Sequence, residues 1–290
     1  MDDEVAKNIH TLDPRDDGAH YEWREFESDD FVRDVKKLLI SYFAPIAKRK
    51  GITLYQATKA TPERWLLIFV LSTLFLLTLP PYIAGQYWTL LVTPVLAWTT
   101  MINYWHDAMH FSLASDWRIN AILPYFLPVM SSPLMWYHQH VIGHHAYTNI
   151  GHKDPDLAHA PQLLREHNSI RWRKSHANQA KMSHVSIMWC IAVFYLTYVS
   201  DLRTNLKLSF NNAVPFAKLS CQRLVCHLMG RVLTFYVCVM WPFFRFPLWK
   251  AAIWSIVPNI CYSISFMLNT QINHLNEECA HASSPNFLKH

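Results

Sequence analysis

The longest uncharged run in this chain extends from Trp65 to Trp105 and contains no Asp, Glu, Lys or Arg. A helix needs roughly 20 apolar residues to cross the hydrocarbon core of a bilayer, so this run is long enough for two crossings. Pro80, Pro81 and Gly85 lie near its middle and predict the break between the two helices. The run therefore predicts a tight membrane hairpin whose two ends emerge on the same side.

A second pair of apolar segments lies further along the chain. It runs from about Leu224 to Phe244 and from Ala251 to Ile272, with a turn that contains Arg245 and Lys250. With the first hairpin, it predicts an all-α, multi-pass membrane protein with about four transmembrane helices as two hairpins and a cytosolic helical cap. Arg231 lies inside the first arm, where its guanidinium must face protein or reach the surface.

Two further apolar stretches are less suited to crossing a membrane. Ile119 to Tyr137 is uncharged but carries Pro124, Pro128 and Pro133, which predict a broken, interfacial or re-entrant segment. Val185 to Ser200 is short, and we expect it to lie in the interface.

Composition agrees with a membrane protein and excludes several other classes. Hydrophobic residues make up 51% of the 290 residues and charged ones only 16%, against roughly 25% charged in soluble domains. The formal net charge of +5 suits an anionic membrane face. The sequence has no clustered basic helix with a nucleic-acid recognition motif. The six cysteines form no CxxC pair and predict neither a disulfide framework nor a zinc knuckle.

The N-terminal part divides into two segments ahead of the main domain, which we place at residues 61–290. Residues 1–30 are acidic and are expected to be disordered, and they lack the features of a cleavable signal peptide. Residues 31–60 are expected to form an amphipathic helix on the membrane surface. Its apolar positions recur at helical spacing and are accompanied by lysines and arginines: Phe31, Val35, Leu38, Leu39 and Tyr42, with Lys36, Lys37, Lys48, Arg49 and Lys50.

Lysines and arginines also predict the orientation. They are frequent before Trp65 and in the loop from Lys153 to Lys181, whereas the turn at Pro80 has none. By the positive-inside rule, the N-terminus and the segments beside this loop face the cytosol. Two further spans would return His274 to the same side.

Seven histidines lie in three short stretches beside these apolar segments. His106 and His110 are four residues apart, His140 and His144 repeat that spacing, and His145 follows directly. On a helix such pairs share a face, and neutral imidazoles without thiolates suit iron, copper or zinc. A lone histidine such as His227 is expected to be a polar anchor. The complete set is His106, His110, His138, His140, His144, His145 and, alone after the last apolar segment, His274. His138 is seven residues before His145, so these two are also expected to share a helix face.

Three motifs make the chain resemble the membrane fatty acid desaturases, especially the branch with the front-end and linoleoyl-CoA desaturases. They are Trp-His106-Asp-Ala-Met-His110-Phe, then Gln-His140-Val-Ile-Gly-His144-His145-Ala-Tyr-Thr-Asn149, then Asp154-Pro-Asp156. The likeness runs from roughly Phe31 to Glu278. It includes an isolated His274 preceded by Gln271, a Gln-x-x-His pattern frequent in that branch.

This resemblance implies a di-iron site with O₂ as co-substrate and a double bond introduced into a fatty acyl chain, as an acyl-lipid or acyl-CoA. It also implies an endoplasmic reticulum membrane location and a separate cytochrome b5 or ferredoxin as electron donor. The implied iron ligands are His106, His110, His140, His144, His145 and His274. A lipid hydroxylase or other monooxygenase on the same scaffold, or a non-catalytic relative, remains an alternative.

The chain departs from the family pattern in three places. The family has a further HxxHH or QxxHH box after the equivalent of His274, and His281 and His290 do not form one. We therefore expect a C-terminally truncated chain or an inactive relative. Many front-end desaturases carry a fused cytochrome b5 domain, and residues 1–60 are too short for one and lack its His-Pro-Gly-Gly motif. His138 is an additional histidine, expected to support the ligands.

Polar residues beside the boxes have two interpretations. Carboxylates and amides often orient ligand imidazoles through the second ring nitrogen. The Asp-Pro-Asp sequence is equally typical of a turn. The supporting residues considered are Asp107, Asn149, Asp154, Asp156 and Gln271.

Overall fold

The structure is a computed structural model. It describes residues 30–126, 132–148, 154–158, 172–179, 181–210, 214–216 and 218–274 of the chain. Apart from Asp30, the acidic segment predicted for residues 1–30 lies outside the described residues, as do Asn149, His281 and His290.

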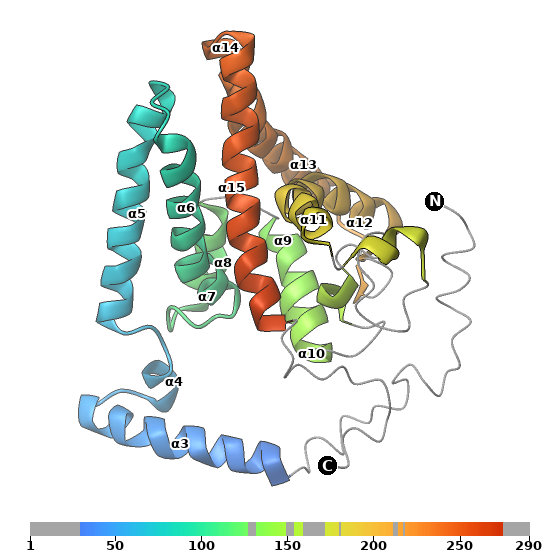
Figure 1. Ribbon diagram of the computed structural model, residues 1–290. Coiled ribbons are helices and arrows are strands. Elements are labelled where there is room, and N and C mark those ends of the chain that lie inside the picture. The colour runs from blue at the N-terminus through green and yellow to red at the C-terminus, as the bar shows by residue number, and fades with distance from the viewer. Residues whose placement is uncertain are drawn as a thin grey trace.

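Helices make up nearly all of the described chain, as the sequence predicts (Figure 1). The N-terminal half contains α3 (Asp30–Lys50), α4 (Leu54–Ala57), α5 (Pro62–Ile83), α6 (Thr89–Met101), η1 (Ile102–His106), α7 (Asp107–Met109), α8 (Trp117–Ile122), η2 (Leu123–Tyr125), α9 (Pro133–Trp136), η3 (Tyr137–His144) and α10 (His145–Tyr147). The C-terminal half contains η4 (Pro155–Ala158), η5 (Lys174–Asn178), α11 (Met182–Phe194), η6 (Tyr195–Ser200), α12 (Asp201–Lys207), β1 (Ser209–Phe210), β2 (Val214–Pro215), α13 (Cys221–Phe235), η7 (Tyr236–Met240), α14 (Trp241–Arg245) and α15 (Leu248–His274). The two short strands pair antiparallel, with Phe210 opposite Val214.

Three helices in the described part of the chain are long and apolar enough to cross a membrane: Pro62–Ile83, Cys221–Arg245 and Leu248–Thr270. They correspond to three of the four predicted spans. The fourth expected span, α6 with η1, is not among them. Several threonines and Asn103 make this segment more polar, and α6 packs between α5 and α15. The two hairpins stand side by side with α15 against α6 (Figure 1).

The turn of the first hairpin differs in one respect from the prediction. Helix α5 continues through Pro80 and Pro81 to Ile83, so the prolines do not break it. Proline's fixed φ fits a helix, and the next turn is closed by a bond from the Ala84 amide to the Pro80 carbonyl, 2.9 Å long. The break falls at Gly85, as predicted, where φ is +81° and a Cβ atom would lie 2.6 Å from Lys250 Nζ. Glycine is therefore needed there for its backbone conformation, whereas the flexible Lys250 side chain can move away from a Cβ atom.

The two weaker apolar stretches are not straight spans. The described part of Ile119 to Tyr137 is broken into the short helices α8, η2 and α9, with Pro124 in η2 and Pro133 at the start of α9, as their prolines predict. Helix α11 runs across α15 and is seen nearly end-on in Figure 1. It is held there by Ser263 Oγ, which accepts a 3.1 Å hydrogen bond from the Val193 amide.

An aromatic core joins α6, α9 and α15 beneath the histidines. The Trp98 ring packs edge-on against Tyr262 and Phe266, with ring centroids 5.9 and 5.6 Å apart. Phe266 also lies 6.2 Å from Trp136, at the end of α9. This packing places the C-terminal end of α15 beside the helix that carries the second histidine cluster, on the side predicted for His274 (Figure 1).

Candidate metal centre

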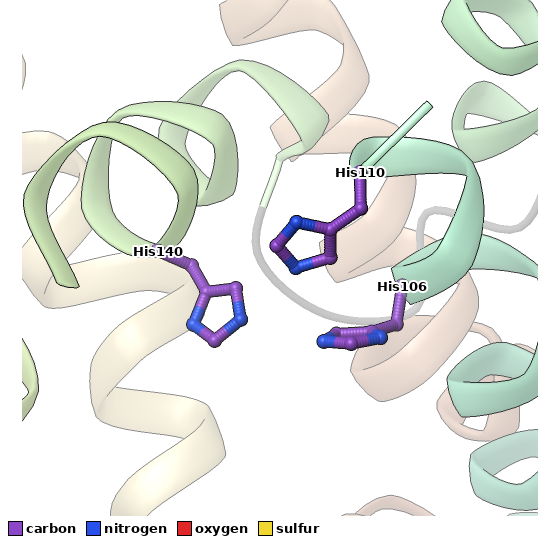
Figure 2. Close-up of side chains that lie close together, drawn as sticks. All are labelled: His106, His110 and His140. Atoms are coloured by element: carbon purple, nitrogen blue, oxygen red, sulfur yellow. The ribbon is translucent and has the colours of Figure 1, made fainter. Parts of the chain in front are cut away.

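Two helical segments that are distant in sequence bring five histidines together. His106 ends η1 and His110 directly follows α7, and their ring centroids are 4.6 Å apart. His140 lies 5.4 Å from the first ring and 5.3 Å from the second, and all three rings point into one space (Figure 2). His145 is 4.5 Å from His110. The first two histidine boxes therefore form one cluster.

The π-helical backbone of η3 explains which histidines join this cluster. In a π-helix the backbone bonds connect residues i and i+5, so residues four and five positions apart flank the same face. His140 accordingly contacts both residues. Its ring is nearly parallel to that of His144, with centroids 5.2 Å apart, and its Nε2 atom lies 3.1 Å from Nε2 of His145. A spacing of seven does not align residues in this geometry, so the expectation that His138 shares a face with His145 is wrong.

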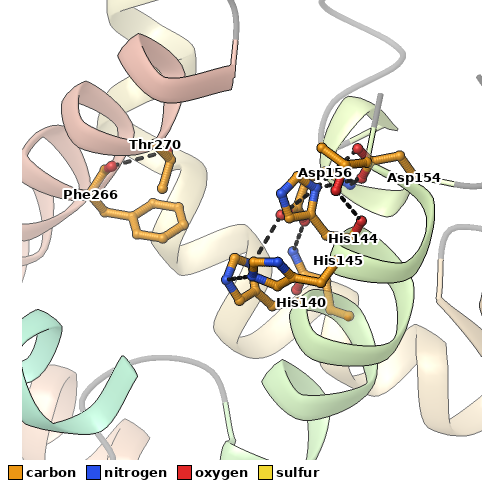
Figure 3. Close-up of polar contacts among 9 residues, drawn as sticks. His140, His144, His145, Asp154, Asp156, Phe266 and Thr270 are labelled. Carbon is orange, nitrogen blue, oxygen red and sulfur yellow. Dashed lines mark hydrogen bonds and ion pairs between the residues drawn. The ribbon is translucent and has the colours of Figure 1, made fainter. Parts of the chain in front are cut away.

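Two buried aspartates hold the rings of the second box. Asp154 lies 3.0 Å from Nδ1 of His144, and Asp156 lies 3.3 Å from Nδ1 of His140 (Figure 3). A carboxylate only accepts hydrogen bonds, so each Nδ1 carries a proton, and in the neutral imidazole Nε2 keeps its lone pair. Gln139 donates to Asp156 at 2.8 Å and fixes it in turn. Of the two interpretations of the Asp-Pro-Asp sequence, these contacts support the one in which the carboxylates orient imidazoles.

A similar but more exposed arrangement holds the first box. Asp107 lies 3.3 Å from Nδ1 of His106. Arg64, at the start of α5, donates to Asp107 at 2.8 Å and also to Asn103. Burial opposes ionisation of Asp107, but the hydrogen bonds from His106 and Arg64 outweigh it and lower the pKa of this carboxyl. Asp107 is thus an anionic acceptor between a ring and a guanidinium.

The cluster keeps most of its imidazoles neutral, which is the form that binds metals. Burial, with the neighbouring rings adding to it, lowers the pKa of His110 to about 3 and that of His145 to about 4. Burial also lowers the pKa of His140, against the opposing effect of Asp156. For His144 burial is outweighed by the bond to Asp154 and the charge of Asp156, so its pKa is raised.

The donor atoms fit a metal ion. His106, His110 and His140 form one group, and His140, His144 and Asp156 form a second, in each of which the ligand atoms lie within 4.8 Å of one another. Nε2 of His110 is buried and has no hydrogen-bond partner in the described part of the chain. A buried nitrogen without a partner is costly, and a metal ion would satisfy it. His140 belongs to both groups, and in the second group Asp156 lies 3.3 and 3.6 Å from the Nδ1 atoms of His140 and His144, which are the contacts that orient these rings.

Three further predicted site residues are His274, Gln271 and His138. His274 is the last residue of α15, but its side chain and that of Gln271 lie outside what the structure describes, so their roles stay predictions. His138 has its own contacts, with its Nδ1 donating to the Leu134 carbonyl at 3.1 Å and its ring 4.7 Å from Phe216.

Sequence reasoning missed three residues that contact the site: Arg64, Gln139 and Trp136. Arg64 is the last charged residue before the long uncharged run, a position that could have marked it. Gln139 stands between two histidines of the second box and could have been considered with them. Nothing in the sequence distinguishes Trp136, whose ring lies 4.7 Å from that of His140, from the other tryptophans.

Fold and site together define a helical membrane protein with a histidine-rich centre at one end of its spans. The profile of the fatty acid desaturase family matches residues 80–287, and the chain belongs to that family. No solved structure matches it significantly.

Several named desaturases are similar to the chain over part of their length. The acyl-lipid (8-3)-desaturase of Mortierella alpina is 26% identical over 233 residues, which are 76% of this chain and 51% of the relative. The acyl-lipid omega-13 desaturase of Chlamydomonas reinhardtii is 26% identical over 200 residues, 66% of this chain and 42% of the relative. The Delta(5) fatty acid desaturase A of Dictyostelium discoideum is 26% identical over 164 residues, 53% and 33% respectively. The chain thus spans about half the length, or less, of these relatives.

Proposed function

We propose that this chain introduces a double bond into the fatty acyl chain of a membrane lipid, using O₂ and a histidine-bound di-iron centre. The observation that carries the proposal is the convergence of five imidazoles whose two buried members have their Nδ1 atoms bound to aspartates. Family membership supports the reaction class. The names of two similar relatives, both acyl-lipid desaturases, favour an acyl-lipid over an acyl-CoA as substrate.

The proposed reaction removes one hydrogen from each of two adjacent carbons and forms a carbon–carbon double bond. With two electrons and two protons from a donor, these two hydrogens reduce O₂ to two molecules of water. Bound iron would supply the oxidising power toward an unactivated C–H bond that side chains alone lack. A separate cytochrome b5 or ferredoxin is the proposed donor.

The residues of the chain have three tasks in this proposal. His106, His110, His140, His144 and His145 offer Nε2 lone pairs to the metal ions, and His274 is proposed as a sixth ligand. Asp154 and Asp156 hold protons on the opposite ring nitrogens and fix the rings in orientation. The buried aromatic side chains of Trp98, Trp136 and Phe266 pack beneath the cluster and shield that side of it from water.

The proposed location is the endoplasmic reticulum, with the N-terminus and the metal centre on the cytosolic side. The lysines and arginines of the sequence support this orientation. The cytosolic side is also where a soluble or membrane-anchored electron donor could reach the centre.

Two measurements test the proposal. Protein expressed in yeast and purified without oxygen should contain about two irons per chain, as its imidazole donors suit iron. Gas chromatography of the lipids of the same yeast should reveal a new unsaturated fatty acid when the expressed protein also carries a final HxxHH or QxxHH box. A protein that retains only zinc under reducing conditions would contradict the proposed centre.

The control separates loss of the site from loss of the fold. His176 is also buried, but it lies in η5 and its Nδ1 accepts a bond from the Arg173 amide. His176→Ala should keep its iron, whereas His144→Ala should lose it at equal protein level. A hydroxylated product in place of an unsaturated one would favour the monooxygenase alternative.

A further inference from the structure

Helix α3 exposes a continuous apolar stripe. Its members lie on one side of the helix, and those at both ends and in the middle are the most exposed: Phe31 at 71%, Leu38 at 68% and Tyr42 at 64%. Leu39 and Val35 extend the same stripe. Ala47 is the only buried residue of α3. Such an area on a well-formed helix indicates an interaction surface.

The rest of the helix is strongly basic. Six basic and two acidic side chains give α3 a net charge of +4. The two acidic residues pair with Arg33 and Lys37. The basic residues Lys48, Arg49 and Lys50 form the last turn, next to the linker that leads to α5. An apolar stripe with basic residues around it matches an anionic phospholipid surface, because lipid tails accept the stripe and phosphates accept the cations.

The placement of α3 fits contact with an anionic phospholipid surface. The helix lies crosswise to α5 and α15, beyond the end at which α5 begins and α15 finishes (Figure 1). The spans define the direction through the membrane, so a crosswise helix at their end runs along the membrane surface. It lies at the same end of the spans as α10, which carries His145.

The connection from α3 to α5 is tightly bonded. Thr53 and Gln56 form a capping box at the start of α4. The Ala60 amide donates to the Ser112 carbonyl at 3.2 Å, and Lys59 Nζ donates to the Phe111 carbonyl at 2.8 Å. The linker is therefore attached to the loop directly after His110, and α3 is held in position before it meets lipid.

We propose that α3 is a preformed docking surface for the anionic leaflet of the membrane. The Phe31–Tyr42 stripe lies among the acyl chains near the headgroups, and Lys48, Arg49 and Lys50 contact lipid phosphates. Because its linker is bonded to the loop after His110, the helix also sets the height of the histidine cluster above the lipid.

Photocrosslinking in the full chain tests this surface independently of catalysis. Benzoylphenylalanine replaces Leu38 in the stripe or, as the matched control, Ala44, which is exposed on the opposite side of the helix. The protein is reconstituted in phosphatidylcholine liposomes with or without phosphatidylserine. Lipid adducts should form at position 38 and remain near background at position 44.

A charge variant tests the choice of an anionic lipid. Lys48→Gln, Arg49→Gln and Lys50→Gln together should lower the adduct yield at position 38 by about threefold or more with phosphatidylserine, since each cation near such a surface contributes to binding. The yield without phosphatidylserine should hardly change. Equal adducts at positions 38 and 44, crosslinks from position 38 to protein in place of lipid, or a yield that is insensitive to phosphatidylserine would overturn the proposal.

Discussion

The described part of the chain contains two buried groups in which an imidazole meets a carboxylate, and they differ in which nitrogen the carboxylate holds. In the histidine cluster, Asp154 and Asp156 hold Nδ1 of their partners. In the second group, between α12 and α13, Asp201 holds Nε2 of His227 at 2.7 Å. Asp201 also lies 3.8 Å from Nε of Arg231 and accepts a bond from Asn205.

This difference separates the candidate metal centre from a structural ion pair. The aspartates of the histidine cluster hold Nδ1 and leave Nε2 of His140 and His144 facing the other imidazoles, whereas the Nε2 of His227 is committed to a carboxylate. Asp201 has its charge balanced by the guanidinium of Arg231, which thereby faces protein, one of the two outcomes predicted for it. A carboxylate beside a histidine is therefore a poor sign of a metal site, and several converging lone pairs are a good one.

The largest expected effect follows from removing the ligand shared by both metal groups. His140→Ala should reduce iron content to background and abolish any new double bond. This loss should exceed the roughly 10–100-fold typical of changing an outer partner. The measurements are iron per chain and the fatty acid profile of an expressing yeast.

His227→Ala is the matched variant from the second group. It should leave iron content unchanged while it lowers the thermal unfolding midpoint. Equal iron loss in the two variants would show that the distinction between the two groups is wrong.

Replacing an aspartate in each group should separate the two effects further. Asp154→Asn should weaken metal binding by about 10–100-fold, because the His144 ring loses its charged acceptor. Asp201→Asn should leave metal binding unchanged but destabilise the fold, since breaking a buried ion pair costs about 3–5 kcal/mol. Chelator competition measures the first change and thermal unfolding in detergent the second. Weaker metal binding in Asp201→Asn, or a destabilised fold with unchanged metal binding in Asp154→Asn, would contradict the distinction between the two groups.

The sequence predicted the parts of the molecule that depend on strong periodic signals. The apolar runs predicted the helices of both hairpins, and Gly85 marked the first turn. The HxxxH spacing of the first box and the HxxxHH spacing of the second predicted that their imidazoles would meet. These predictions succeeded because hydrophobicity and helix geometry act locally.

Other features depend on contacts that no local signal records. The backbone of η3 is π-helical, so His145 faces His140 and His138 does not follow the α-helical expectation. Arg64 reaches Asp107 across 43 residues of sequence, a contact that exists only after α5 and α6 have packed. Pro80 and Pro81 resemble a helix break in isolation, but they fit within the last turns of α5.

A smaller effect is expected from Arg64, which acts on the cluster only through Asp107. The side chains of Arg64 and Asp107 are 34% and 27% exposed, so water can replace part of their interaction. Arg64→Gln should therefore weaken metal binding by less than about tenfold, which is the smallest loss typical of a residue that hydrogen-bonds a metal ligand.

A double variant tests the route of this effect. Adding Arg64→Gln to Asp107→Asn should weaken metal binding little further, because coupled residues are not additive. Arg118→Gln, which removes an exposed guanidinium from α8, should leave metal binding unchanged. Full additivity of the first two substitutions would show that Arg64 acts by another route.

The smallest effect is expected at His138, the histidine of the second box that the π-helical turn directs elsewhere. Its Nδ1 donates to Leu134 within its own helix, and its ring packs on Phe216 after β2. His138→Ala should keep the iron and lose about 0.5–1.5 kcal/mol of stability, the value of one aromatic contact. His138→Phe keeps the ring and should recover much of that stability. If His138→Ala instead lost metal as strongly as Asp154→Asn, then His138 would support the ligands after all, and the boundary of the cluster would have to include it.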